Sequence, residues 1–218
     1  MKEQFYFAEK SQLLTQAQLL AFEHAKSSLK IGIPKETTLQ ENRVALVPHS
    51  VINLTARGHE IVIESEAGLK SNYSDHEYSE AGAQIVHDKK SVYECDIILK
   101  VAPPTQEELE YFRPNQILIS PLQLPTITSD YIQMLRQRRV TSLAMEYMQA
   151  DDNSFPIVRT MSEIAGLAVI HTAAELLSDS KNGKGILLGG ISGVPPAKVV
   201  ILGAGVVAEY ATRAALAL

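Results

Sequence analysis

The feature that most constrains the fold is a regular alternation of short apolar segments with polar, helix-forming ones from residue 29 onward. Segments 97–99 and 117–119 contain only Ile and Leu, which is typical of strands buried on both faces of a parallel sheet. Their spacing fits βαβ units, in which helices cover the sheet. We therefore predict an α/β fold with a Rossmann-like parallel sheet. The predicted strands are 29–33, 60–64, 84–86, 96–101, 116–120, 140–145 and 198–202, and the predicted helices between them are 49–56, 75–81, 105–112 and 129–137.

The last predicted strand runs directly into the sequence Gly-Ala-Gly-Val-Val-Ala at 203–208, and an alanine-rich helix follows. Gly-x-Gly-x-x-Ala between a strand and a helix is a dinucleotide-binding fingerprint. Gly203 permits the tight turn, Gly205 lets the backbone approach a pyrophosphate, and Ala208 keeps the helix near the sheet. The N-terminus of that helix offers N–H groups and partial positive charge to phosphates. The sequence therefore predicts a dinucleotide site here, and the alternative is a tight turn without a ligand.

The chain is predicted to contain three regions. Residues 1–28 are expected to be a helical extension, 29–160 an N-terminal substrate domain, and 161–218 a linking helix with the first strand and helix of an incomplete NAD-binding Rossmann domain. The acid that holds the ribose hydroxyls is expected about 20 residues after the fingerprint, beyond Leu218. The sequence is therefore interpreted as a truncated fragment that binds NAD weakly or not at all and is inactive by itself.

The linking helix has its own start signal and an unusual composition. Thr160 is expected to cap the helix, and Glu163 is expected to complete a capping box by reaching back to the cap amide. From Ile164 to Leu177 the helix is apolar on nearly every side. A helix of this kind is predicted to be buried, between two domains.

Composition excludes several classes of protein. A hydrophobic share of 45% and a net charge of −5 rule out disorder and argue against a nucleic-acid binder, which would carry an excess of Lys and Arg. No apolar run approaches the roughly 18 residues of a membrane helix, and no secretory signal is recognisable. The single cysteine, Cys95, excludes an intrachain disulfide and a paired-cysteine metal site. We expect a cytoplasmic protein with no metal site, no nucleic-acid partner and no membrane segment.

Several motifs together resemble the alanine dehydrogenase family, which includes the α-part of nicotinamide nucleotide transhydrogenase. The matching stretches keep the family's order and spacing over residues 29–218 and are 31–36 (Ile-Gly-Ile-Pro-Lys-Glu), 41–48 (Glu-Asn-Arg-Val-Ala-Leu-Val-Pro), 96–101, 161–166 (Met-Ser-Glu-Ile-Ala-Gly) and 189–205. The resemblance implies two Rossmann-like domains and NAD-dependent oxidative deamination of L-alanine to pyruvate and ammonia. The substrate would therefore be a small 2-amino or 2-oxo acid. Residues 156–166 look more like the dehydrogenases than the transhydrogenase, which carries a longer polar loop before this helix.

Three residues outside the fingerprint are candidates for the site. Arg43 suits a carboxylate anchor because a planar guanidinium binds a carboxylate bidentately, and it follows a strand, where α/β sheets bind ligands. Taken alone, it would be interpreted as a surface arginine, and the resemblance reverses that interpretation. The resemblance also implies that Glu146 lies near the substrate cleft and that Ser162 lies near the cofactor.

Two positions depart from the family pattern. The resemblance implies a substrate-contacting lysine and an acid/base histidine where this chain has Ala102 and Gln123. Glutamine cannot exchange a proton at neutral pH, and general acid–base catalysis is worth roughly 10²–10⁴ in rate. Lys100 would face the same side of its strand as Ala102, but it is displaced by about 6.6 Å, so we expect it to be a strand-end charge that reaches solvent. The catalytic acid/base stays unassigned, and the substrate could be altered.

Two other classes of function stay open. A transhydrogenase-type subunit passes hydride between two nicotinamides. It would not need the lysine and histidine that are replaced here, but it would need a membrane-bound partner subunit. A non-catalytic, nucleotide-linked binding protein would keep the cleft without the chemistry. In the dehydrogenase interpretation we expect a homo-oligomer that acts in amino-acid metabolism.

Overall fold

The computed structural model describes residues 28–218, so the helix predicted within the extension lies outside the described residues. The described residues form two compact units, which divide between Leu143 and Ala144. Within the described residues, no helix is both long enough and apolar enough to cross a membrane.

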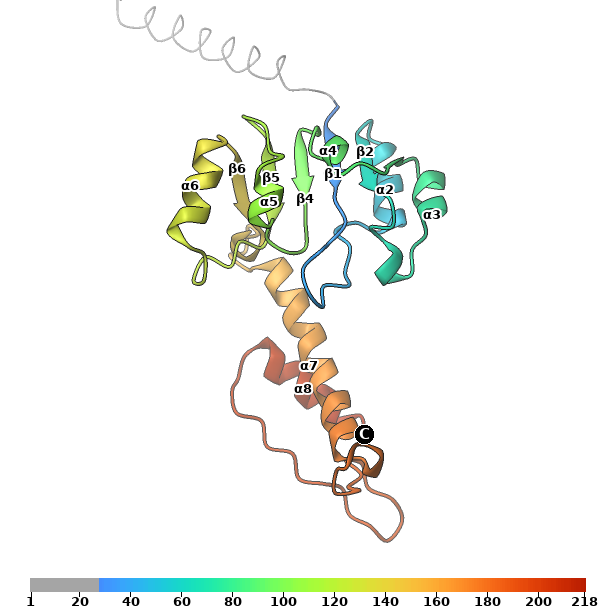
Figure 1. The fold of residues 1–218 in the computed structure, drawn as a ribbon. Helices are drawn as coiled ribbons and strands as arrows, with labels where there is room; N and C mark the ends of the chain where they lie inside the picture. Colours follow the sequence, from blue (N-terminus) through green and yellow to red (C-terminus); the bar gives the residue numbers. More distant parts are fainter. Residues whose placement is uncertain (1–27) are drawn as a thin grey trace, which may run out of the picture. The chain divides into compact units, whose positions relative to one another are not determined.

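The first unit is built on a six-stranded sheet with the strand order β3-β2-β1-β4-β5-β6, and Figure 1 labels the run from β2 through β1, β4 and β5 to β6. The pairings of β1 with β2, β2 with β3, β1 with β4 and β4 with β5 are all parallel. The predicted Rossmann-like α/β fold is confirmed. The strands are β1 (Lys30–Ile33), β2 (Glu60–Glu64), β3 (Gln84–Val86), β4 (Ile97–Leu99), β5 (Ile117–Ser120) and β6 (Thr141–Ala144).

The strand order reverses between β1 and β4. The chain builds outward from β1 through β2 to β3, and then returns to place β4 on the other side of β1. In open α/β sheets, ligands bind at the carboxyl ends of the strands beside such a switch point. A ligand of this unit is therefore expected to bind at the loops that follow β1 and β4.

Helices and short turns connect these strands, and three of the helices carry a side-chain cap. Ser74 and Thr105 each form a capping box, with Glu77 and Glu108 respectively, and Thr128 accepts a hydrogen bond from the Tyr131 amide. These caps satisfy amides that have no partner within their own helix. The helices are α2 (Pro48–Thr55), α3 (Asp75–Glu80), α4 (Lys89–Val92), α5 (Gln106–Leu109) and α6 (Ser129–Gln137), with a 3₁₀ turn η1 (Leu69–Ser71). The sequence analysis did not predict α4.

The core of the first unit lies on the sheet and is closely packed. Ile63, Ile98 and Leu118 on the central strands are at most 1% exposed. Tyr78 of α3 is also buried, its hydroxyl donates to the Leu46 carbonyl at 2.7 Å, and burial raises the pKa of Tyr78 to about 12. Gly32 shows how close the layers are, because a Cβ atom there would lie 2.4 Å from the Val92 carbonyl oxygen.

The second unit is mostly helical. It consists of the turn η2 (Met145–Tyr147), the long helix α7 (Pro156–Leu177), the turn η3 (Asp179–Lys181), an extended segment and the helix α8 (Val206–Leu216). Gly166 marks where α7 and α8 cross, because a Cβ atom there would lie 2.6 Å from the Val207 carbonyl oxygen.

The predicted start of the long helix is wrong. α7 begins at Pro156, with Phe155 at the N-cap, because proline is already fixed in a helical φ and needs no amide partner in the first turn. Thr160 therefore lies inside the helix, where its hydroxyl donates to the Pro156 carbonyl at 3.0 Å. Glu163 pairs with Arg159 at 3.1 Å instead of completing a capping box.

The prediction that α7 is buried on nearly every side is also not met in the described structure. Gly166 and Ile170 are buried, whereas Ile164 and Leu176 are 53% and 64% exposed. The buried positions lie where α8 packs, and α8 covers only one side of the longer helix. The apolar composition therefore marks surface that this unit does not itself cover.

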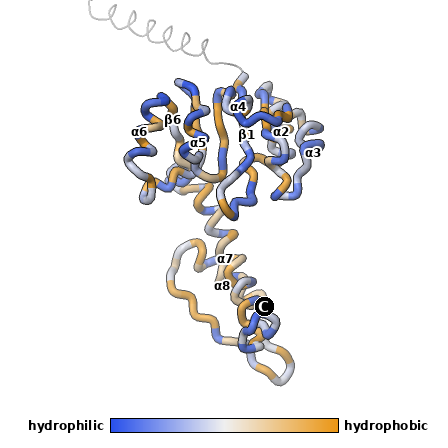
Figure 2. Tube along the Cα trace, in the orientation of Figure 1, coloured by the Kyte–Doolittle hydropathy of each residue, from blue (hydrophilic) through white to orange (hydrophobic). Residues whose placement is uncertain are grey.

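The predicted strand at 198–202 is likewise wrong, because this segment forms no strand in the structure. A strand requires a neighbour to pair its amides and carbonyls, and in the second unit the structure shows only an isolated bridge between Ile191 and Val194. Val200 and Leu202 are consequently 74% and 95% exposed. Figure 2 shows that the segment leading to α8 is apolar over much of its length.

Candidate functional site

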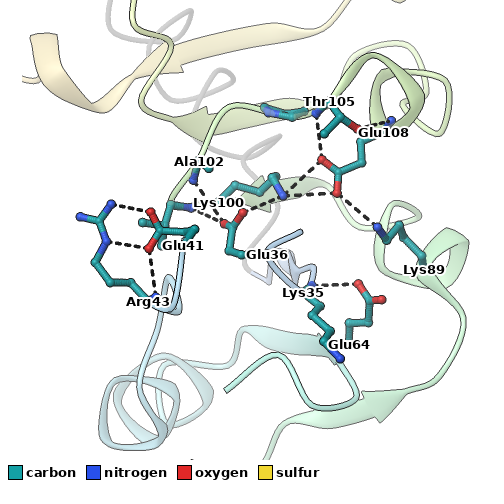
Figure 3. Close-up of polar contacts among 12 residues, drawn as sticks. Lys35, Glu36, Glu41, Arg43, Glu64, Lys89, Lys100, Ala102, Thr105 and Glu108 are labelled. Carbon is teal, nitrogen blue, oxygen red and sulfur yellow. Dashed lines mark hydrogen bonds and ion pairs between the residues drawn. The ribbon is translucent and has the colours of Figure 1, made fainter. Parts of the chain in front are cut away.

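A buried carboxylate joins the loops after β1 and β4. Glu36 is 5% exposed, and its Oε1 accepts hydrogen bonds from the backbone amides of Val101 at 2.6 Å and Ala102 at 3.3 Å. Figure 3 shows this contact, with Glu36 reaching across from its own loop. The carboxylate therefore fixes the first two residues after Lys100 at the switch point of the sheet.

Lys100 lies inside this arrangement. It is 1% exposed, and its Nζ lies 3.0 Å from Glu36 Oε2 and 3.3 Å from Glu108 Oε2. Glu108 itself is 2% exposed and pairs with Lys89 at 3.3 Å. The prediction that Lys100 reaches solvent is wrong, because two buried carboxylates compensate its charge and burial of a charge requires such pairing.

Arg43 follows on the same loop as Glu36 and is held by Glu41. Its Nε lies 2.8 Å from Glu41 Oε1 and its Nη2 lies 2.6 Å from Oε2, a two-pronged contact (Figure 3). The hydrogen bonds from Arg43 hold the pKa of the Glu41 carboxyl below its usual value, and the same contact raises the pKa of Arg43. The Arg43 side chain is 53% exposed. Glu41 therefore occupies the two-pronged edge of this guanidinium, about half of which is accessible to solvent.

The other positions that the sequence comparison with the family singled out differ in their surroundings. Ala102 is 6% exposed, beside the Glu36 carboxylate. Gln123 is exposed in the loop after β5 with a φ of 53°, and its carbonyl accepts a hydrogen bond from the Thr126 amide. Glu146 belongs to the second unit, where it is half-buried in η2.

The glycine-rich turn before α8 has the backbone geometry that a phosphate group needs. Gly203 has a φ of 133°, which glycine adopts far more readily than other residues. Gly205 is the N-cap of α8 and supplies no side-chain cap, and a Cβ atom at Gly205 would meet nothing within 4 Å. The first amides of α8 therefore begin beside open space and not behind a side chain.

The structure brings the four predicted cofactor residues together. Ser162, Gly203, Gly205 and Ala208 all line one pocket of about 670 Å³ within the second unit. Apolar side chains of α7 and of the segment before α8 line the rest, among them Ile170. A pocket that is mostly apolar with a polar backbone turn at its edge is typical of cofactor sites, so these residues fit a dinucleotide with its pyrophosphate at the turn.

The sequence analysis missed the buried ion cluster around Lys100. The sequence position of these residues could have indicated the cluster. Glu36 lies shortly after β1 and Lys100 directly after β4, and β1 and β4 are neighbours in the sheet. Charges at the carboxyl ends of adjacent parallel strands meet at one edge of the sheet. Glu108 could not be assigned in this way, because it comes from α5.

Comparisons with known proteins agree with this architecture. Residues 32–165 match the family described as alanine dehydrogenase/PNT, N-terminal domain, and residues 168–218 match alanine dehydrogenase/PNT, C-terminal domain. An alanine dehydrogenase from Staphylococcus epidermidis is 42% identical over 190 residues, which cover 87% of this chain and 51% of that protein.

Two solved structures are also similar. A structure titled L-alanine dehydrogenase superposes with a TM-score of 0.83 at 36% identity, covering 87% of this chain and 52% of the other. A transhydrogenase from Sinorhizobium meliloti superposes with a TM-score of 0.74 at 29% identity, covering 86% and 56%. The chain spans about half the length of the curated relatives it matches. Since the N-terminal family model alone matches more than half of the chain, the chain belongs to the alanine dehydrogenase/PNT family.

Proposed function

We propose that this chain supplies the substrate-anchoring loop and the dinucleotide-binding turn of an NAD-dependent, alanine dehydrogenase-like oxidoreductase that converts L-alanine to pyruvate and ammonia. The observation that carries the proposal is the shared pocket of Ser162, Gly203, Gly205 and Ala208. The similarity to the alanine dehydrogenase of S. epidermidis supports the choice of substrate.

The residues of the second unit would hold NAD through its phosphates. Gly203 and Gly205 would bring the backbone close to the pyrophosphate, and the first amides of α8 would donate hydrogen bonds to it. Ser162 would offer a hydroxyl from α7 on the other side of the same pocket. The bound cofactor would supply a nicotinamide ring that accepts hydride.

Arg43 would anchor the carboxylate of the substrate. Its guanidinium holds the Glu41 carboxylate bidentately, and the carboxylate of a 2-amino or 2-oxo acid would displace Glu41 from the same edge. Arginine binds carboxylates with a defined geometry, whereas lysine acts as a point charge. Glu146 is proposed as a further residue of the substrate side.

Ala102 and Gln123 set this chain apart from the alanine dehydrogenase pattern. Neither side chain can transfer a proton at neutral pH, so the proton acceptor would have to come from elsewhere in the protein. This observation supports a second candidate, hydride transfer of the transhydrogenase type, and the similarity to the S. meliloti transhydrogenase agrees with it. The replacements at Ala102 and Gln123 also support a third candidate, a dehydrogenase whose substrate is a 2-amino acid other than L-alanine.

Absorbance at 340 nm tests these candidates directly. The intact protein is mixed with NAD and a panel of 2-amino acids, and NADH formation is followed. A rise that depends on L-alanine supports the proposal, and a rise with another 2-amino acid identifies an altered substrate. NAD binding without NADH formation from any amino acid overturns the dehydrogenase proposal. Hydride exchange between two nicotinamide nucleotides would then identify the transhydrogenase type.

The variant Arg43→Lys sharpens this experiment. It keeps the positive charge but loses the planar fork, so we expect the KM for the amino acid to rise by at least about tenfold. Arg57→Lys, on the loop between α2 and β2, is a matched control that should leave the KM unchanged. An equal KM for both variants would show that Arg43 does not bind the substrate.

A further inference from the structure

We propose that Glu36 and Lys100 form a positioning clamp, which holds the loop that carries Arg43 and the loop that carries Ala102 in the geometry needed to bind the substrate. The inference deepens the proposed function, on which it rests. It assigns both residues a positioning role and not a catalytic one, because neither side chain is accessible to a substrate.

The first part of the argument is that one carboxylate ties two loops together. Glu36 follows β1 and lies seven residues before Arg43 along the chain. Its Oε1 binds the amides of Val101 and Ala102, and its Oε2 lies 3.0 Å from Lys100 Nζ. Since β1 and β4 are neighbours at the switch point, this contact sets how the two loops lie relative to each other.

The second part is that the loop after β4 is held along its whole length. Glu36 holds its start at Val101 and Ala102. The Tyr131 hydroxyl, from α6, donates to the Pro104 carbonyl at 2.9 Å. Glu108 accepts from the Thr105 amide at 2.9 Å and also pairs with Lys100. The backbone from 101 to 105 is therefore fixed at three places by groups from three different elements.

The third part concerns the charges. Lys100 is enclosed by two carboxylates, and the partly exposed Lys89 pairs with Glu108, so the cluster contains equal numbers of positive and negative groups. Removing one member leaves an uncompensated buried charge. Breaking this cluster should therefore cost more than breaking an exposed ion pair.

The fourth part explains why the placement of the loop that carries Arg43 matters in this chain. Ala102 has a methyl group where the family resemblance implies a lysine that contacts the substrate. Without that contact, substrate recognition in the first unit depends more on Arg43, so displacing the loop that carries Arg43 would weaken substrate binding. The clamp would therefore act mainly on substrate binding.

The test compares Glu36→Gln with Glu64→Gln in the intact protein. Both changes remove the charge of a carboxylate that accepts a backbone amide at the end of a strand, but Glu64 binds the Lys35 amide and does not reach the loop after β4. The first readout is native-state hydrogen exchange at the amides of Val101 and Ala102. We expect Glu36→Gln to speed this exchange by at least about tenfold and Glu64→Gln to leave it unchanged.

The second readout is the kinetics of the proposed reaction. We expect Glu36→Gln to raise the KM for the 2-amino acid by about tenfold with kcat within about twofold. Tyr131→Phe keeps its ring and removes only the hydroxyl that holds Pro104, so it should fold and raise the KM by a smaller factor. A merely structural role would lower the amount of folded protein without moving the KM.

Two results would overturn the clamp. One is unchanged exchange at Val101 and Ala102 in Glu36→Gln. The other is an unchanged KM in both Glu36→Gln and Tyr131→Phe when the wild type is active. If the wild type forms no NADH with any 2-amino acid, the dehydrogenase proposal fails instead, and the exchange rates still decide whether Glu36 holds the loop.

Discussion

Two apolar segments of similar composition have opposite fates in this molecule. Residues 117–119 of β5 lie in the sheet between β4 and β6, and Leu118 is fully buried. Residues 199–202 in the second unit are equally apolar, yet they form no strand, and Leu202 is 95% exposed. The difference shows that an apolar run becomes a strand only where neighbouring chain pairs its backbone and covers its side chains.

The two candidate sites differ in the same way. In the first unit, side chains build the site, and Glu36, Glu41 and Glu108 match each cation with a carboxylate. In the second unit, the site is mainly backbone, a glycine turn that leads into α8. Substitutions in the first unit should therefore change stability and substrate binding, whereas substitutions in the turn should change cofactor binding alone.

The largest expected effect separates the two apolar segments. Leu118→Ala removes a fully buried side chain and should lower the free energy of unfolding of the first unit by about 2–5 kcal/mol. Leu202→Ala lies in the second unit and should change the free energy of unfolding of that unit by no more than about 0.5 kcal/mol, because the side chain is already exposed. Urea unfolding followed by circular dichroism measures both. Equal losses for the two variants would break the comparison.

A second pair of substitutions makes the same contrast with glycines. Gly32→Ala places a Cβ atom 2.4 Å from the Val92 carbonyl oxygen and 3.0 Å from Val92 Cγ1, so it should cost roughly 1–3 kcal/mol. Gly205→Ala meets open space at a φ of −85° and should fold like the wild type. Thermal unfolding of both variants checks this. A large loss of stability in Gly205→Ala would show that the turn is packed.

The buried thiol of the first unit should make its stability depend on pH. Burial raises the pKa of Cys95 from 9.0 to about 11. Above pH 9 the unfolded chain loses this proton while the folded chain keeps it, so stability should fall as the pH rises from about 9 to about 11. By pH 10 the expected loss is about 1 kcal/mol. Cys95→Ala should remove this part of the pH dependence, and an unchanged slope in that variant would contradict the assignment.

The smallest expected effect concerns the exposed pair of Arg43 and Glu41. Because Arg43 lowers the Glu41 pKa, the pair should stabilise the fold above the ordinary glutamate pKa. This contribution should disappear as the pH falls through the lowered value. Glu41→Gln should cost no more than about 1 kcal/mol, as for other solvent-accessible ion pairs. An NMR titration of the Glu41 carboxyl should move toward its ordinary pKa in Arg43→Gln, and no movement would contradict the pairing.

Local sequence patterns predicted the first unit well, and non-local contacts explain most of the errors. The apolar run at 60–64 and the helix predicted at 129–137 depend on near neighbours in the sequence, and both occur as expected. The strand predicted at 198–202 failed because pairing depends on chain far away. The burial of Lys100 was not predicted because Glu36, which compensates its charge, lies in the loop after another strand. The Thr160 cap failed for a local reason, since Pro156 offers an earlier helix start.

The candidate sites were predicted to a different extent. The fingerprint and the family resemblance together named Ser162, Gly203, Gly205 and Ala208, which the structure places around one pocket. The resemblance also named Arg43, but its two-pronged contact with Glu41 required coordinates. Side-chain partners that are distant in sequence, such as Glu36 and Lys100, leave no pattern in a single chain, whereas a backbone turn leaves its glycines.

The central claim is that a nicotinamide dinucleotide binds with its diphosphate at the turn before α8. Calorimetric titration of NAD into the intact protein tests it, with Gly205→Ala as the perturbed variant and Arg43→Lys as the control. We predict saturable binding to the wild type, an affinity weakened by about tenfold or more in Gly205→Ala and an unchanged affinity in Arg43→Lys. Equal NAD affinity for wild type and Gly205→Ala, or no binding to the wild type, would contradict the account.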